Sequence, residues 1–323
     1  MWKVVIRGLV LLFGLVLVAM PPAFAQQYPN KVVKIVIPFA PGGSADTVLR
    51  PLAEKLGAAL GQAVVVDTRA GGLTVIGAEY VAKSPPDGYT LYLMAGTHVL
   101  LPYLLQNVPF DPIKDFIPIA MLGAQPYLFV AHPGQPFNST SEMIRYAKAN
   151  PGKLSIGVSD IVTRVAAESF LSAAQVDMSV VPYKGGGPVT TDVLGGHLSV
   201  GIASPLLLSY VKEGRLKALG ISSAKRISSA PALPTIEEAA GIPGYEMQTW
   251  YAIAGPAGIP PNIVARLRRD IERILAEPDM RQRLAEVGWE PAGSMTTEQA
   301  QQLMTDYMQK MGKLIRAAGI KPE

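Results

Sequence analysis

The sequence lacks cysteine: none of its 323 residues is one. A chain without cysteine forms no disulfide, binds no metal through thiolates and has no thiol nucleophile. Histidine is scarce, and the three residues at positions 98, 132 and 197 show no metal-ligand spacing such as H-E-x-x-H. We therefore expect no bound metal.

Motifs of catalysis and nucleotide binding are missing as well. The chain has no G-x-S-x-G nucleophile elbow, no G-x-x-x-x-G-K-[ST] phosphate loop and no G-x-G-x-x-G fingerprint opening a strand-to-helix unit. We expect no cofactor and no enzymatic activity, although a Ser-His-Asp triad assembled in space leaves a secreted hydrolase as an alternative. Lysine and arginine form no block, so a nucleic-acid partner is not expected.

No long apolar run follows residue 25, so we expect no membrane-spanning helix in the rest of the chain. The first 25 residues differ: Lys3 and Arg7 precede an apolar stretch at 8–20, and Ala23-Phe24-Ala25 follows. This pattern predicts a secretory signal peptide, residues 1–25, cleaved after Ala25. A membrane anchor is the alternative, but the apolar stretch is short for a span of about 20 residues.

Strand-like and helix-like segments alternate through the remaining chain, which predicts βαβ units and parallel sheets. The first and last segments give strands at 32–39, 63–67, 90–94 and 250–254, and helices at 44–60, 77–83, 260–276, 280–287 and 297–318. The middle segment gives strands at 127–131, 155–158, 180–182, 200–203 and 216–221, and helices at 141–149, 164–173 and 189–194. Crossings near Ala124 and Gln248 favour two lobes around a cleft, with a single larger sheet as the alternative.

Ligands of open parallel sheets bind beyond the carboxyl ends of the strands, and five loops there are candidates. Glycines bring backbone N–H groups close to a ligand in the loops at 38–46, 69–77 and 183–188. In the first loop, the start of the following helix favours an anion, although Ser44 or Asp46 as a helix N-cap is the alternative. The loop at 183–188 also resembles a phosphate cradle, which the missing motifs disfavour.

The two other loops carry polar side chains. The loop at 96–98 contains His98, which can donate to a carboxylate or serve a structural role. The loop at 158–164 contains Arg164, which can pair with a ligand carboxylate or form a salt bridge with Asp160 or Glu168.

The same loops resemble those of the substrate-binding proteins of tripartite tricarboxylate transporters, the Bordetella uptake family. The resemblance covers essentially the whole mature chain. It rests on Tyr28-Pro29, Ile37-Pro38-Phe39-Ala40-Pro41-Gly42-Gly43, Ala82-Lys83-Ser84-Pro85-Pro86-Asp87-Gly88-Tyr89-Thr90-Leu91, Gly96-Thr97-His98, Pro109-Phe110-Asp111-Pro112, Val181-Pro182-Tyr183-Lys184-Gly185-Gly186-Gly187-Pro188, Asp192-Val193-Leu194-Gly195-Gly196 and Leu233-Pro234-Thr235.

The resemblance implies a two-lobed α/β periplasmic-binding-protein (Venus-flytrap) fold, each lobe a mainly parallel sheet flanked by helices. Residues 26–124 and 248–323 would form lobe 1, and residues 125–247 lobe 2. It implies a monomer in the periplasm that closes on a small carboxylate and delivers it to the membrane subunits of the transporter; a sensor for a signalling kinase is an alternative role. The expected ligand contacts are Phe39, Ala40, Gly42, Gly43, Ser44, Ala45, Asp46, Gly72, Leu73, Gly77, Thr97, His98, Ser159, Asp160, Thr163, Arg164, Tyr183, Gly186, Ala203 and Ser204.

Three loops depart from the family pattern. Residues 69–75 lack the usual proline and asparagine, residues 160–164 replace a glycine- and asparagine-rich run, and residues 203–205 lack the frequent aspartate and asparagine. Leu73, Val75, Ile161 and Val162 make the expected pocket more apolar, and Arg164 adds a cation. The resulting hypothesis is a dicarboxylate with an apolar middle, terephthalate first and adipate next, with an amino acid or a citrate-like acid as the alternative.

Overall fold

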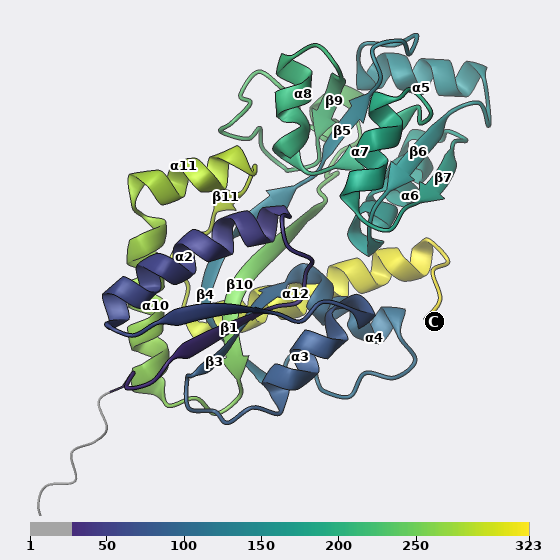
Figure 1. The fold of residues 1–323 in the computed structure, drawn as a ribbon. Coiled ribbons are helices and arrows are strands. Elements are labelled where there is room, and N and C mark those ends of the chain that lie inside the picture. The colour runs from purple at the N-terminus through teal and green to yellow at the C-terminus, as the bar shows by residue number, and fades with distance from the viewer. Residues whose placement is uncertain (1–27, 323) are drawn as a thin grey trace, which may run out of the picture.

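The computed structural model describes residues 28–322, and the predicted signal peptide lies outside the described residues. Two α/β lobes lie side by side and are joined by two long strands (Figure 1). No helix within residues 28–322 is long and apolar enough to cross a membrane.

The sheet of lobe 1 has six strands in the order β11-β4-β10-β3-β1-β2. The strands are β1 (Val33–Ile37), β2 (Val64–Thr68), β3 (Thr90–Ala95), β4 (Phe116–Pro126), β10 (Gln248–Pro256) and β11 (Glu290–Pro291). Strand β1 is parallel to β2 and β3, whereas β10 is antiparallel to β3 and β4. Residues from both faces of β1 are buried, as expected of a central strand covered on both sides.

Helices cover both faces of this sheet. Val33, Ile35 and Ile37 pack into one core with α2 (Ser44–Leu60), α10 (Pro261–Leu275) and α11 (Pro278–Glu286). Val36 points the other way, into a core with α3 (Val75–Ala82), α4 (Leu101–Leu104) and α12 (Thr297–Ala317). The short 3-10 turns η1 (Gly72–Thr74) and η2 (Gly96–Leu100) follow β2 and β3. The alternation along β1 follows from the two-residue period of a strand.

Lobe 2 is built around five strands in the order β7-β6-β8-β5-β9. They are β5 (Leu128–Ala131), β6 (Ser155–Val158), β7 (Ser179–Pro182), β8 (Val200–Ala203) and β9 (Lys217–Ile221). Its helices are α5 (Thr140–Ala149), α6 (Ile161–Ala174), α7 (Gly186–Leu194), α8 (Leu208–Lys212) and α9 (Ile236–Ala240), with η3 (Pro205–Leu207) after β8. The core under α5 and α6 joins that of lobe 1, whereas α7 covers the opposite face.

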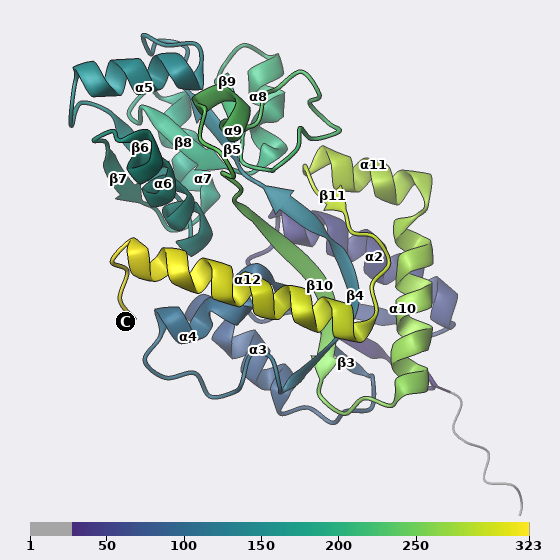
Figure 2. The same ribbon diagram turned by 180° about the vertical axis from the view of Figure 1, so that it is seen from behind.

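The two lobes are connected where β4 and β10 lie together. Gln248 at the start of β10 pairs with Pro126 at the end of β4, so the two crossings of the chain are neighbours. On the face turned towards the viewer in Figure 2, α12 lies across β4 and β10 and reaches α6 of lobe 2. Lys310 of α12 forms an ion pair at 3.2 Å with Glu246, next to the second crossing. Two adjacent strands and one helix therefore link the lobes.

The predicted two-lobed α/β fold is confirmed, and the single larger sheet is wrong. Both sheets are mixed rather than mainly parallel. The parallel pairs belong to the predicted βαβ units, and β4, β5, β9, β10 and β11 add the antiparallel pairs. Strand β4 was not predicted, because Pro118 and Gly123 interrupt its apolar run. Pro118 is accommodated at a shift in the register with β10, where a strand tolerates proline.

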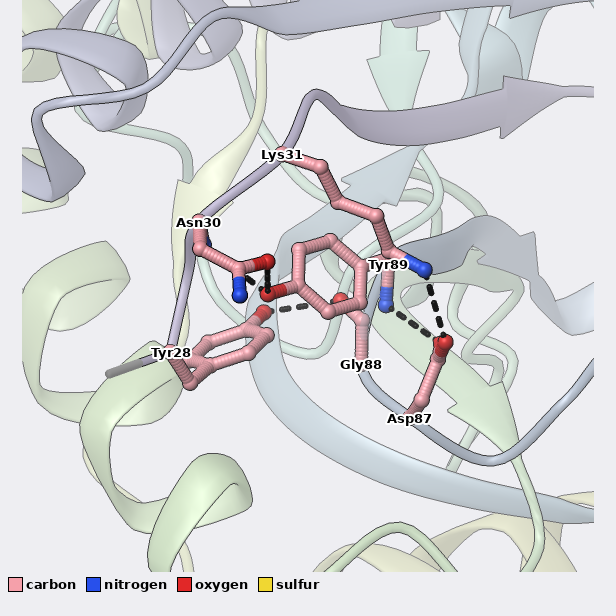
Figure 3. A network of polar contacts seen from close by, with 6 residues as sticks. All are labelled: Tyr28, Asn30, Lys31, Asp87, Gly88 and Tyr89. Carbon is pink, nitrogen blue, oxygen red and sulfur yellow. Dashed lines mark hydrogen bonds and ion pairs between the residues drawn. The ribbon is translucent and has the colours of Figure 1, made fainter. Parts of the chain in front are cut away.

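Two motifs that carry the family resemblance contact each other at the start of lobe 1 (Figure 3). The Tyr28 hydroxyl donates to the Gly88 carbonyl at 2.7 Å, and the Tyr89 hydroxyl donates to Asn30 Oδ1 at 2.8 Å. Lys31 pairs with Asp87 at 3.2 Å. These motifs therefore fasten the first described residues to the turn before β3, and their role here is structural.

Candidate functional site

A cavity of about 800 Å³ lies between the lobes, where loops from both sheets converge. Lobe 1 contributes Pro38, Phe39, Ala40, Gly43, Ser44, Ala45, Ala70, Gly71, Leu73, Thr74, Ala95 and Thr97. Lobe 2 contributes Ser159, Asp160, Lys184, Gly185, Gly186, Gly187, Thr190, Ala203, Ser204, Leu206 and Leu207. The crossings add Gln125, Tyr127, Thr249 and Tyr251. Two smaller cavities against α12 contain none of the predicted ligand contacts, so we assign the site to the interlobe cavity.

The amino end of α2 faces this cavity without a side-chain cap. Gly43 is the N-cap residue and has an extended backbone, while Ser44 and Ala45 form the first turn. The free N–H groups of a first turn, together with the helix dipole, attract an anion. The alternative in which Ser44 or Asp46 is the N-cap is therefore wrong.

Asp46 in the first turn of α2 is occupied by other partners. It accepts a hydrogen bond from the Gly42 amide at 3.1 Å and forms an ion pair with Arg50 at 2.9 Å. Burial opposes ionisation, but these bonds outweigh it and hold the pKa of the Asp46 carboxyl below its usual value. The Asp46 charge is therefore paired with Arg50.

The loop between β2 and α3 enters the cavity in an unusual backbone conformation. Gly71, Gly72, Leu73 and Thr74 all have positive φ, with values of 52° for Leu73 and 84° for Thr74. A left-handed conformation costs about 1–2 kcal/mol for a residue with a side chain. Leu73 is nevertheless 50% exposed and lines the cavity. Such strain is typical of functional loops, and here it presents an apolar side chain to the ligand space.

Two helices of lobe 2 begin at the cavity, but only one has a free amino end. Asp160 caps α6: its Oδ1 accepts from the Thr163 amide at 2.9 Å, and Thr163 Oγ1 accepts from the Asp160 amide at 3.0 Å. Helix α7 follows Gly185, which has a φ of 98° and provides no side-chain cap. Added Cβ atoms at Gly186 and Gly187 would meet nothing within 4 Å, so the first turn of α7 is open.

The cavity has one cationic side chain, Lys184, directly before α7. Within residues 28–322, Lys184 forms no hydrogen bond or ion pair. The free amides of α7 and the Lys184 ammonium together make a second place for a negative group. The cavity therefore has two anion-binding ends, one in each lobe.

Asp160 is the acidic group of the cavity. Its side chain is exposed towards the space between the lobes rather than to bulk solvent, and Ser159 Oγ donates to its Oδ2 at 3.1 Å. Burial between the lobes raises the pKa of Asp160, and the bonds from Thr163 and Ser159 only partly offset this. Because Asp160 already occupies the amino end of α6, an anionic ligand group is directed towards the open ends of α2 and α7.

His98 does not reach the cavity. Turn η2 directs Thr97 into the cavity and His98 into an aromatic cluster, where its ring stacks on Phe110 and meets Phe116 edge-on. Its Nε2 lies 3.1 Å from the Pro112 carbonyl, and burial lowers the pKa of His98 from 6.5 to about 3. The alternative structural role of His98 therefore fits its surroundings better than donation to a ligand.

Arg164 also lies away from the cavity lining. It occupies the first turn of α6 and is exposed, and no ion pair within residues 28–322 involves it. Arg164 is not among the cavity-lining residues, and the alternative salt bridge with Asp160 or Glu168 is not formed within residues 28–322. The reason is geometric, because Asp160 turns back to cap the helix and Arg164 points elsewhere on its surface.

Six other predicted contacts are absent from the lining. Thr163 is buried in the cap of α6, and the Tyr183 hydroxyl donates to Asp192 at 2.6 Å. Gly77 packs against β1, where an added Cβ would approach the Arg69 carbonyl to 3.0 Å. Gly42, Asp46 and Gly72 are absent from the lining although their neighbours are present. The predicted residues that line the cavity are Phe39, Ala40, Gly43, Ser44, Ala45, Leu73, Thr97, Ser159, Asp160, Gly186, Ala203 and Ser204.

The prediction omitted several lining residues. Lys184 lies within the glycine-rich loop at 183–188, and its positive charge was the feature of the sequence that could have identified it as a ligand contact. Gln125, Tyr127, Thr249 and Tyr251 gave no signal, because they meet only through the pairing of β4 with β10. The Tyr251 ring stacks on Trp289 with centroids 4.0 Å apart, which fixes one wall of the cavity.

Two α/β lobes around a shared cavity define a two-lobed binding protein of the periplasmic-binding-protein class. A family model described as "Tripartite tricarboxylate transporter family receptor" matches residues 48–320, and the chain belongs to this family. The predicted family resemblance is thereby confirmed. The family comprises transporter receptors, which also confirms that the chain is not an enzyme.

Similar proteins agree with this assignment. Protein BugT of Bordetella pertussis is 33% identical over 305 residues, covering 93% of each chain. Rpa4515 of R. palustris, solved with adipate, is 31% identical, with a TM-score of 0.83 over 92% of this chain and 100% of its own. MatC of Rhodopseudomonas palustris, solved with malate, is 28% identical, with a TM-score of 0.77 over 89% of this chain and 100% of its own.

Proposed function

We propose that this chain is a periplasmic binding protein that captures a dicarboxylate with an apolar middle and delivers it to the membrane subunits of a tripartite tricarboxylate transporter. The observation that carries the proposal is the pair of uncapped helix amino ends, α2 in lobe 1 and α7 in lobe 2, that face one cavity. A ligand with two carboxylates satisfies both ends at once.

The walls between the two ends are largely apolar. Phe39 and Leu73 line the cavity from lobe 1, and Leu206 and Leu207 line it from lobe 2. Apolar walls favour an apolar spacer because its burial contributes about 25 cal/mol for each Å² removed from water. An aromatic diacid such as terephthalate and an aliphatic diacid such as adipate both have this character. The adipate and malate bound to the two related proteins are diacids as well.

The ligand is expected to hold the lobes together. One carboxylate would meet the α2 amides near Gly43, and the other would meet the α7 amides and Lys184. Because these groups belong to different lobes, only the closed arrangement provides both contacts, and the ligand shifts the population towards it. Lys184 thus takes the role that the sequence had suggested for Arg164.

Asp160 supports a second candidate, an amino acid. Its carboxylate lines the cavity and can pair with a ligand ammonium, while α2 would still hold the ligand carboxylate. The raised pKa of Asp160 weakens this candidate, because the surroundings disfavour the charge that an ammonium requires.

Calorimetric titration of the mature protein, residues 26–323, tests the proposal. The panel contains terephthalate, adipate, malate, citrate, glutamate, and benzoate as a matched monocarboxylate. We expect tight binding of terephthalate or adipate and weak binding of benzoate and glutamate. Binding of glutamate alone would establish the second candidate, and failure of every carboxylate would overturn both. A rise in melting temperature with the same ligands provides an independent readout, since a ligand of the folded state stabilises it.

A further inference from the structure

Gln125 occupies the junction between the lobes. It lies near the end of β4, one residue before Pro126, and only 4% of it is exposed. Its Nε2 donates to Ser204 Oγ of lobe 2 at 3.0 Å and to the Val287 carbonyl of lobe 1 at 3.1 Å. Its Oε1 accepts from the Tyr251 hydroxyl at 3.3 Å and from Ser44 Oγ at 3.5 Å. Both hydrogens and both lone pairs of the amide are therefore used.

The orientation of this amide follows from chemistry. The Val287 carbonyl can only accept a hydrogen bond, so the amide nitrogen of Gln125 must face it. The same nitrogen carries the hydrogen that Ser204 Oγ accepts. Leu206 N also donates to Ser204 Oγ, at 3.3 Å. The Ser204 oxygen thus receives two hydrogen bonds, and its own hydrogen has no acceptor within residues 28–322.

Ser204 lines the ligand cavity, so its hydroxyl hydrogen is free to point into the cavity. We propose that Gln125 is a positioning residue that makes Ser204 a hydrogen-bond donor to an oxygen of the bound ligand. The inference rests on the proposed carboxylate-binding function and adds a selection rule. The Ser204 wall selects a ligand group that accepts hydrogen bonds, such as a carboxylate or a carbonyl, over one that only donates them.

Gln125 also couples this selection to the arrangement of the lobes. One side chain contacts Ser44 in the first turn of α2, Tyr251 on the connecting strand β10, and Ser204 beyond β8. These contacts belong to both lobes. A movement of lobe 2 away from lobe 1 would break the bond to Ser204, so the donor is correctly directed only when the lobes are close.

A double-mutant cycle with Gln125→Met and Ser204→Ala tests the proposal, using the diacid that binds best. A hydrogen bond to a charged group stabilises by roughly 1.5–3 kcal/mol, so each single variant should lose about tenfold or more in affinity. If Gln125 acts through Ser204, the double variant binds no more weakly than the weaker single variant. If the fold losses in affinity of the two single variants multiply in the double variant, the proposal is overturned. Ser204→Thr keeps the hydroxyl and should retain most of the affinity.

A second measurement requires no ligand and separates this inference from the proposed function. Crystal structures of the ligand-free wild type and of Gln125→Met, compared in crystals in which the lobes are closed, should show Ser204 in one rotamer in the wild type and in several in the variant. An unchanged single rotamer in the variant would overturn the positioning role, even if the protein binds carboxylates. If Gln125→Met does not fold, a wild-type crystal structure with closed lobes still decides, because a Ser204 hydroxyl turned away from Gln125 in that state excludes the role.

Discussion

The replacement Gly43→Asp is expected to stabilise the protein while abolishing ligand binding. Gly43 is the N-cap of α2 and has φ −78° and ψ 172°, which any residue can adopt. A Cβ added there has only the Ala40 carbonyl within 4 Å, at 4.0 Å, so the aspartate fits without displacing its neighbours. Its carboxylate would accept from the same first-turn amides that we assign to the ligand carboxylate.

The magnitude of the stability gain follows from three small effects. Aspartate exceeds glycine as an N-cap by a few tenths of a kcal/mol. A negative charge at the start of a helix contributes roughly 0.3–1 kcal/mol. Replacing glycine reduces the freedom of the unfolded chain by about 0.4–1 kcal/mol. Repulsion from Asp46 is limited because its charge is paired with Arg50. The sum is about 1–2 kcal/mol, which corresponds to a rise of about 2–4 °C in melting temperature for a protein of this size.

The loss of binding should be much larger. Two hydrogen bonds from amides to a charged carboxylate are worth about 1.5–3 kcal/mol each, and the new aspartate also repels the ligand. We expect the affinity for a diacid to fall by at least about a hundredfold. Melting curves of the ligand-free variant and calorimetric titration measure the two effects. Gly43→Ala is the matched control, since it adds the Cβ without the carboxylate and should keep most of the affinity. Unchanged affinity in Gly43→Asp would refute the assignment of the α2 amino end to the ligand.

Three further predictions concern other parts of the chain. Lys184→Met should lower the affinity for a diacid about tenfold and leave the affinity for benzoate unchanged, as measured by calorimetry. Arg164→Met is the control and should change the affinity for neither ligand. Equal losses of affinity for both ligands in Lys184→Met would contradict the role of Lys184. Because the folded protein keeps His98 neutral to about pH 3 whereas the unfolded chain gains the proton near pH 6.5, stability should fall by up to about 1.4 kcal/mol per pH unit below 6.5. Urea unfolding at pH 7 and pH 5 should show a smaller fall in His98→Gln, and an identical fall would disprove this account. Gly288→Ala would place a Cβ 2.2 Å from Pro205 of lobe 2. It should therefore lower the free energy of unfolding by about 1–3 kcal/mol more than the control Gly319→Ala, where φ is similarly positive but the space is open. Equal melting temperatures of the two variants would argue against this contact.

The sequence predicted much of the fold because its signals are local. The strands at 155–158 and 200–203 and the helix starting at Ser44 agree with the structure, since apolar runs, glycines and caps act over a few residues. Strand β4 escaped prediction because its proline and glycine are tolerated only in the presence of β10. The two lobes were recognisable from the sequence, but the antiparallel pairing of the strands that join them was not.

The candidate site was likewise predicted only as far as its local signals reach. Loops that follow β1 and β8 were identified, and Gly43, Leu73, Asp160 and Ser204 line the cavity. Side-chain direction could not be read from the sequence, because it depends on the turn that each residue occupies. Thr97 and His98 are neighbours in one 3-10 turn, yet the first enters the cavity and the second enters the core.

By itself the sequence determined the α/β class, the family, the loops at the carboxyl ends of the strands and the lack of enzymatic motifs. Each of these follows from residues that are close together in the chain. The tertiary structure alone decided that Lys184 rather than Arg164 faces the cavity, that the open ends of α2 and α7 face the same cavity, and that Gln125 joins the two lobes. These features depend on which helix ends meet across the cleft and on how β4 pairs with β10, and residues more than a hundred positions apart create them.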